Sequence, residues 1–139
     1  MGLYVGAEST VSSLLVSNIL PVAIEVGRSL SGAITVTNNG TLKLIGGFQN
    51  QTGYLLSSVS MSGGTLEADE TSTITGALSH TGNITIDVAE DKTLTYTGTA
   101  INVGANTLTM SGKGTFSNTN ALVLNDASSK LLLLSLIHI

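Results

Sequence analysis

The chain has 139 residues, enough for one domain with one hydrophobic core. Its hydrophobic content of 42% and mean hydropathy of +0.38 exclude a disordered chain, although charged residues are only 10% against about 25% in an average protein. The net charge is −4 and the five basic residues are scattered, which argues against a nucleic-acid-binding protein. Cysteine is absent, so disulfides, thiolate chemistry and cysteine-ligated metals are excluded.

The first thirty residues carry no clear targeting signal. No basic residue precedes Arg28, and the apolar stretch Val11–Ile24 is short, partly polar and interrupted by Pro21. We therefore expect neither a targeting segment nor insertion into a membrane. Residues 21–32 form a looser version of the pattern that follows, and we expect them to make an irregular first coil.

From residue 33 onward the chain alternates apolar and polar residues with a period of two, which predicts half-buried β-strands. Glycine-containing steps separate these segments, as turns require, and good helix formers are scarce. The clearest alternating segments are Ile34–Val36, Leu42–Leu44, Ile84–Ile86, Leu94–Tyr96, Ile101–Val103 and Leu108–Met110.

A two-strand phrase with a turn in its middle recurs along the chain, with irregular spacing of roughly twenty residues. Its copies begin at Ala33, Ser58, Asn83, Ala100 and Ala121. One such unit cannot cover its own apolar face and must stack on a copy of itself, which is the signature of a solenoid. We predict an all-β chain in which residues 1–135 form a single parallel β-helix (β-solenoid) domain of five to six irregular coils. An antiparallel β-sandwich, which also has short, regularly spaced strands, is the alternative.

The C-terminal residues 131–139 abandon the alternation and form an uncapped apolar tail. Two interpretations stay open for its last part, Ser135–Ile139: a final β-rung, or a translated sequencing adapter, whose product the letters SLIHI resemble. In either case an exposed, uncharged aliphatic run favours association between chains. We therefore expect end-to-end or edge self-association.

Residues that could carry chemistry are few. His80 is expected in an exposed turn, and His138 lies in the tail. Asp87, Glu90 and Asp91 are weak candidates for a calcium site, although their spacing matches no known calcium loop and a solvated turn explains them. Glu67, Asp69 and Glu70 form a second acidic turn of the same kind. We predict no catalytic residue and no cofactor, and hence a protein that is not an enzyme.

Threonines recur in rows on the predicted strands, and they are the feature of the sequence that suggests a binding role for the outer surface. Thr85, Thr95, Thr107 and Thr109 are the candidates for a surface array of hydroxyl and methyl groups. Such an array can bind ice or glycans, whereas the simpler explanation is the preference of threonine for solvated β-strands.

The repeated Thr-Leu phrases with their Thr, Ser, Asn and Gly filler, over about residues 22–135, resemble the passenger regions of bacterial autotransporters and filamentous-haemagglutinin-like adhesins. The resemblance implies a right-handed parallel β-helix and a non-catalytic structural or adhesive role. It also implies an extracellular or cell-surface location in bacteria and a host-surface or glycan ligand. A carbohydrate-active, polysaccharide-lyase-like β-helix is the other alternative, but Tyr4, Tyr54 and Tyr96 are sparse material for the aromatic platforms that it would need.

Overall fold

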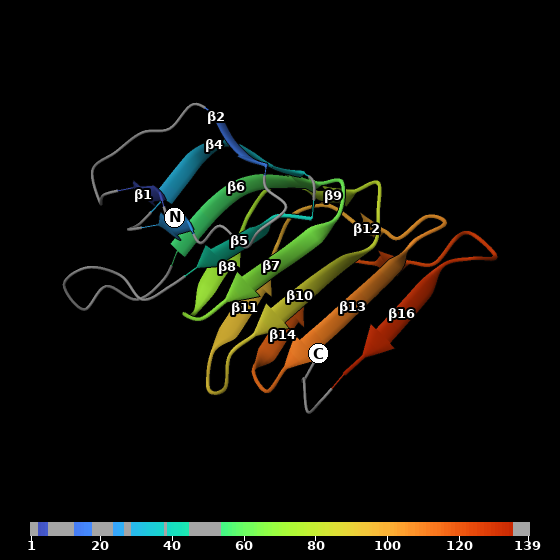
Figure 1. Cartoon of the computed structure of the whole chain (residues 1–139). Helices are drawn as coiled ribbons and strands as arrows, with labels where there is room; N and C mark the ends of the chain where they lie inside the picture. Colours follow the sequence, from blue (N-terminus) through green and yellow to red (C-terminus); the bar gives the residue numbers. More distant parts are fainter. Residues whose placement is uncertain are drawn as a thin grey trace.

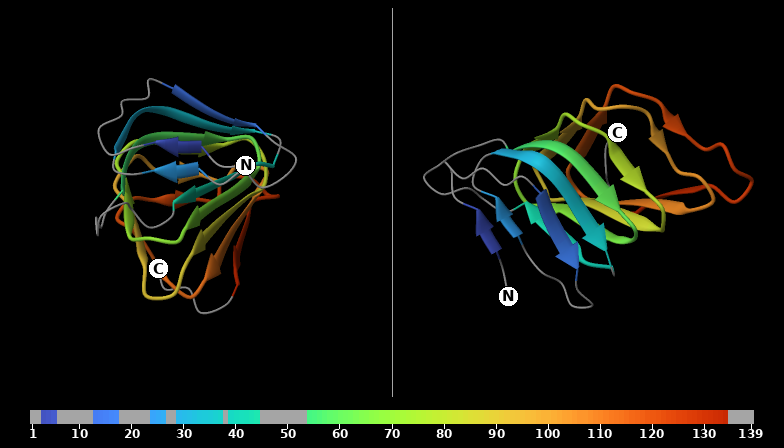
Figure 2. Two further views of the ribbon diagram at one scale, coloured as in Figure 1. Left: turned by 60° about the vertical axis from the view of Figure 1, so that its left-hand side comes forward. Right: turned by 90° about the horizontal axis from the view of Figure 1, so that it is seen from above.

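The structure, a computed structural model, describes the backbone at residues 3–5, 13–17, 24–26, 29–37, 39–44 and 54–134, and the side chains at 34–37, 39–44 and 58–134. All secondary structure in these residues is β, and every strand pairing is parallel. The strands stack as coils of a β-solenoid of about four turns (Figures 1 and 2). The predicted β-solenoid is therefore confirmed, and the parallel pairings rule out the antiparallel sandwich. Among the described residues four coils have a strand on each of their sides, against the five to six coils expected, and β2, β15 and β16 belong to incomplete coils at the two ends.

Each coil contributes one strand to each of three sides. Side A comprises β2 (Ser13–Ser17), the second part of β4 (Ser29–Thr37), the second part of β6 (Tyr54–Met61), β9 (Leu78–His80), β12 (Ile101–Asn102) and β15 (Leu122–Val123). Side B comprises β5 (Thr41–Leu44), β7 (Gly64–Ala68), β10 (Ile84–Val88), β13 (Thr107–Gly112) and β16 (Lys130–Leu133). Side C comprises the first parts of β4 and β6 with β8 (Ser72–Ile74), β11 (Thr93–Tyr96) and β14 (Thr115–Asn118). Two further strands, β1 (Leu3–Val5) and β3 (Ile24–Val26), pair with each other near the N-terminus.

The repeating unit therefore has three strands where the sequence showed two. The copies at Ala33, Ser58, Ala100 and Ala121 each cover sides A and B, whereas the phrase that begins at Asn83 covers sides B and C. The matching copy begins one strand earlier, at β9. Because the strands of all three sides alternate in the same way, the alternation alone does not reveal which side a strand occupies.

Inward side chains line up in columns that run from coil to coil. On side B one column contains Leu42, Leu66, Ile86, Met110 and Leu133, each paired in register with the next. The first four are at most 1% exposed. Burying a side chain of this size stabilises the fold by about 1.5–3 kcal/mol, so the stacking of coils supplies most of the hydrophobic stabilisation.

Side C differs from the largely aliphatic columns of side B because it buries two aromatic rings, Tyr96 and Phe116, both fully. The hydroxyl of Tyr96 accepts a hydrogen bond of 2.9 Å from the backbone N–H of Leu78, so the polar end of the ring has a partner inside the core. Tyr96 is therefore a core residue and not part of a surface platform.

Turns stack as closely as strands, and Gly64 is one of the positions where this requires glycine. Gly64 has a φ of +92°, and a Cβ there would lie 2.1 Å from the carbonyl oxygen of Gly40 in the coil below. Gly104 has a similar φ of +60°, but its Cβ would meet nothing nearer than 3.5 Å. Both positions have a left-handed backbone, but only at Gly64 does the neighbouring coil leave no room for a side chain.

Substitution of these two glycines separates the two effects. Gly104→Ala should lower the free energy of unfolding by about 1–2 kcal/mol, the cost of a left-handed backbone for an L-residue. Gly64→Ala should cost at least about 1–3 kcal/mol more, because the coils must separate to admit the methyl group. Urea unfolding followed by circular dichroism measures both values, and equal losses would show that the close approach at Gly64 does not constrain the stack.

Candidate functional site

A column of four threonines is the most regular feature of the outer surface. Thr41, Thr65, Thr85 and Thr109 occupy equivalent positions on β5, β7, β10 and β13 of side B. All four are partly exposed, and neighbouring strands of a sheet lie about 4.7–4.9 Å apart. The four hydroxyls and four methyl groups therefore repeat along the solenoid axis at that spacing. We call this set the threonine column.

The structure brings only two of the four predicted array residues together. Thr85 and Thr109 are neighbours in the threonine column. Thr107 lies on the same strand as Thr109 but pairs with Lys130, and Thr95 lies on side C between Thr73 and Ser117. The predicted array is therefore divided between two sides of the solenoid.

Sequence reasoning missed Thr41 and Thr65, the other half of the threonine column. Thr41 and Thr65 each stand alone on their strands, without a second threonine two residues away. Both residues lie instead in a Gly-Thr-Leu triplet, Gly40–Leu42 and Gly64–Leu66. The glycine marks the stacked turn that precedes side B, so this triplet was the available signal.

The outward column two residues further along side B is polar and charged, and it contains Lys43, Glu67, Asp87 and Ser111. The ammonium group of Lys43 lies 2.8 Å from a carboxylate oxygen of Glu67 and 2.9 Å from one of Asp69. Its hydrogen bonds to Glu67 and then to Asp69 raise the pKa of Lys43 above its usual value. Lys43 is therefore held as a cation, which is the wrong state for a catalytic base.

The three calcium candidates are not brought into one group. Asp87 accepts a hydrogen bond from the hydroxyl of Ser111 on side B. Glu90 is exposed and lies 3.7 Å from Lys113, while Asp91 has a φ of 62° in the same turn. Among the residues that the structure describes, no three acidic or histidine side chains are placed to hold a metal ion.

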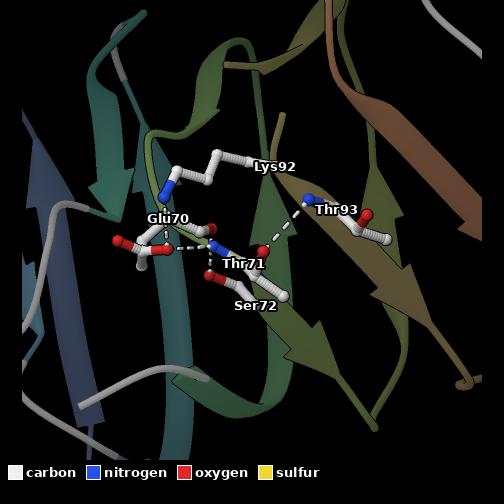
Figure 3. A network of polar contacts seen from close by, with 5 residues as sticks. All are labelled: Glu70, Thr71, Ser72, Lys92 and Thr93. Carbon is white, nitrogen blue, oxygen red and sulfur yellow. Dashed lines mark hydrogen bonds and ion pairs between the residues drawn. The ribbon is translucent and has the colours of Figure 1, made fainter. Parts of the chain in front are cut away.

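Glu70, in the other acidic turn, belongs to a network of polar contacts that joins two coils (Figure 3). Lys92 donates a hydrogen bond of 2.8 Å to a carboxylate oxygen of Glu70, which also accepts one of 3.1 Å from the backbone of Thr71. The backbone N–H of Thr93 donates to the hydroxyl of Thr71. These contacts stabilise the ionised carboxylate, with Lys92 as the main cause, and they lower the pKa of Glu70. The network connects the turn before β8 with the turn before β11.

His80 was expected in an exposed turn, and that expectation is wrong. It ends strand β9, pairs in register with Met61 and is only 9% exposed. Because a carbonyl oxygen only accepts, Nδ1–H of His80 donates to the carbonyl of Gly82 at 2.9 Å. Its Nε2 is buried and has no hydrogen-bond partner among the residues that the structure describes. The alternation of Leu78-Ser-His80 places the ring inward, and this periodicity could have predicted its burial. The residues that follow, which are typical of a turn, obscured it. His138 lies outside the described residues, as does the whole of Ser135–Ile139.

Two further observations concern the described residues as a whole. They form no pocket. No segment of them is a helix of the length and apolarity that crossing a bilayer requires.

Comparisons with protein-family models, with curated proteins and with solved structures found no match to this chain. The resemblance to autotransporter passengers and haemagglutinin-like adhesins therefore stays a prediction from the residues that carry it.

The network of Glu70 and Lys92 predicts a pH dependence of stability. The folded-state pKa of Glu70 lies below the usual value of 4.5, so its contribution is present above pH 4.5 and is lost as the pH falls through the folded-state pKa. Lys92→Met should lower the free energy of unfolding by about 0.5–1 kcal/mol at pH 7, and the difference from wild type should shrink below pH 4.5. Urea titrations at several pH values between 7 and 3 measure this.

The matched control is Lys113→Met, which removes the longer and more exposed contact with Glu90 and should change stability little at any pH. A deficit of Lys92→Met that stays constant down to pH 3 would contradict the assigned contact.

Proposed function

We propose that the chain is a non-catalytic structural segment of a bacterial surface or secreted protein, a stiff rod that displays its outer surface. The observation that carries the proposal is the continuous in-register stacking of coils, with apolar columns inside and polar columns outside. Strands are joined along the rod axis by backbone hydrogen bonds, and the ion pairs of Lys43 and Lys92 join neighbouring coils as well.

The physical consequence of this stacking is resistance to local opening. A protease needs a stretch of chain in extended, unpaired form, and proteins expose such stretches where few buried contacts hold them. Between β7 and β14 each strand is paired along its length and buries alternate side chains. A rod of this kind suits exposure to proteases outside the cell. The bacterial and extracellular parts of the proposal are supported by the resemblance of the Thr-Leu repeats to adhesin passengers.

Limited digestion with proteinase K, followed by mass spectrometry, tests the rod. We expect a resistant fragment that contains residues 64–118, because these form the fully stacked coils. The control is Ile86→Asp, which places a charge in the core column and should be degraded at least tenfold faster. Cleavage of the wild type between β7 and β14 at the rate of this control would overturn the proposal.

A second candidate function, carbohydrate binding, is favoured by the threonine column on side B. Four hydroxyls in register lie beside a column that offers carboxylates at Glu67 and Asp87. Hydroxyl groups of a sugar can donate to the carboxylates, and such charge-assisted hydrogen bonds are stronger than neutral ones. The charged column also makes this side a better match to a polar sugar than to ice.

A glycan array probed with the purified chain tests the second candidate. We expect binding that falls at least tenfold in the double variant Thr85→Val, Thr109→Val, since valine keeps the shape and the β-propensity but loses the hydroxyls. The matched control is Thr73→Val, Thr95→Val on side C, which should bind like wild type. Equal binding by both variants would exclude the threonine column. Shortening of an acidic polysaccharide in the same samples would support the lyase-like alternative instead.

A further inference from the structure

Side C carries a second set of outward threonines, which is wider than the threonine column of side B. On three successive coils the strands β8, β11 and β14 alternate inward residues with an outward threonine or serine. Pairing in register, and a hydrogen bond from the backbone of Thr93 to the hydroxyl of Thr71, place these outward residues side by side. Two columns of three result, and we call them the threonine grid: Thr71, Thr93 and Thr115 in one, Thr73, Thr95 and Ser117 in the other.

The backbone of the sheet fixes the dimensions of the threonine grid. Neighbouring strands lie about 4.7–4.9 Å apart, and alternate residues of one strand lie about 6.6 Å apart. Threonine is β-branched and has a restricted χ1, so its hydroxyl and methyl groups keep a constant direction from coil to coil. Directly beneath the grid, the side chains of Leu94, Tyr96 and Phe116 are fully buried and hold the strands in place. The grid is therefore a rigid array of hydroxyl and methyl groups with two fixed repeats.

The threonine grid carries no charge. Among the residues whose side chains the structure describes, charged groups lie on side B, in the turns that join sides B and C, and in the segment 126–130. The large exposed apolar side chains, Leu124 and Leu132–Leu134, also lie outside side C. A nucleic acid or an anionic membrane needs cations, and the centre of a protein interface is rich in aromatic residues, methionine and arginine. The grid offers none of these groups.

We propose that the threonine grid is an ice-binding surface. A hydroxyl both donates and accepts hydrogen bonds, as does each water molecule of ice. The two repeats of the grid approach those of a prism face of hexagonal ice, so water held at the hydroxyls lies in register with the crystal. Charge complementarity favours the same ligand, because the ice lattice is neutral and an ionic group would keep its own hydration shell.

Rigidity makes a surface of many weak contacts effective. Binding costs less when the receptor is ordered beforehand, and β11, the central strand of the grid, is paired on both edges, with β8 and β14. The grid begins at β8, since Leu55 is the residue that pairs with Thr73 from the coil before. It lies along the side of the solenoid, so further coils at either end lengthen the rod and leave side C uncovered.

The freezing behaviour of a solution of the full chain tests the proposal. The chain should hold the freezing point of water below the melting point (thermal hysteresis) and should slow the recrystallisation of fine-grained ice. Thr95→Lys, at the centre of the grid, should reduce the thermal hysteresis at least about fivefold, because the ammonium group brings a tightly bound hydration shell to the contact. The matched control is Thr85→Lys on side B, which should behave like wild type. Absence of hysteresis in the wild type, or an equal loss in both variants, would overturn the proposal.

Two conservative variants separate ice binding from folding. Ser117→Thr adds the methyl group that the grid lacks at this position and should raise the thermal hysteresis, whereas Thr95→Ser removes one and should lower it. Both should leave the circular dichroism spectrum nearly unchanged, because each alters one methyl group on the outer surface. Equal hysteresis in the two variants would show that the methyl groups of the grid do not contact the crystal, and it would overturn the proposal.

Discussion

The whole structure depends on one constraint, that each coil must be covered by the next. A single coil has three short strands with one apolar side chain at every second position, and nothing within the coil can cover them. In-register parallel pairing solves two problems at once, because it satisfies the backbone groups and places Leu66 on Leu42 and Ile86 on Leu66. The same constraint explains why the interior is buried from Ile34 to Phe116 and becomes exposed at Leu133.

The fold was predictable from the sequence because its period-two alternation and its repetition are both local signals. The side of the coil that each strand occupies was not predictable. The segments Ile84-Thr-Ile86 on side B and Ile101-Asn-Val103 on side A, for example, have the same pattern of apolar and polar residues. They occupy different sides because β10 follows a strand of side A and β12 follows a strand of side C, and neither segment carries a side-specific signature. His80 illustrates the same difficulty at the level of one residue: its neighbours Thr81 and Gly82 are typical of a turn, while its own position continues the inward alternation of β9.

The candidate surface was harder to predict than the fold. Thr85 and Thr109 were identified, but a column forms between coils, and the partner of each residue lies 20 to 24 positions away along the chain. The length of each intervening turn must be known before such partners can be named. The polar contacts between coils were hard to predict for the same reason. Lys43 contacts Glu67 and Asp69 only because β5 and β7 stack in register.

The direction of the backbone hydrogen bonds has a mechanical consequence. The strands run across the rod and their hydrogen bonds lie along it, so tension applied through the chain ends loads one strand pairing at a time. A terminal coil can peel away while the coils behind it stay paired. With 20 to 24 residues per coil, each such event releases roughly 70–80 Å of extended chain. Under tension, a molecule built in this way extends in discrete steps, one coil at a time, while its remaining coils stay folded.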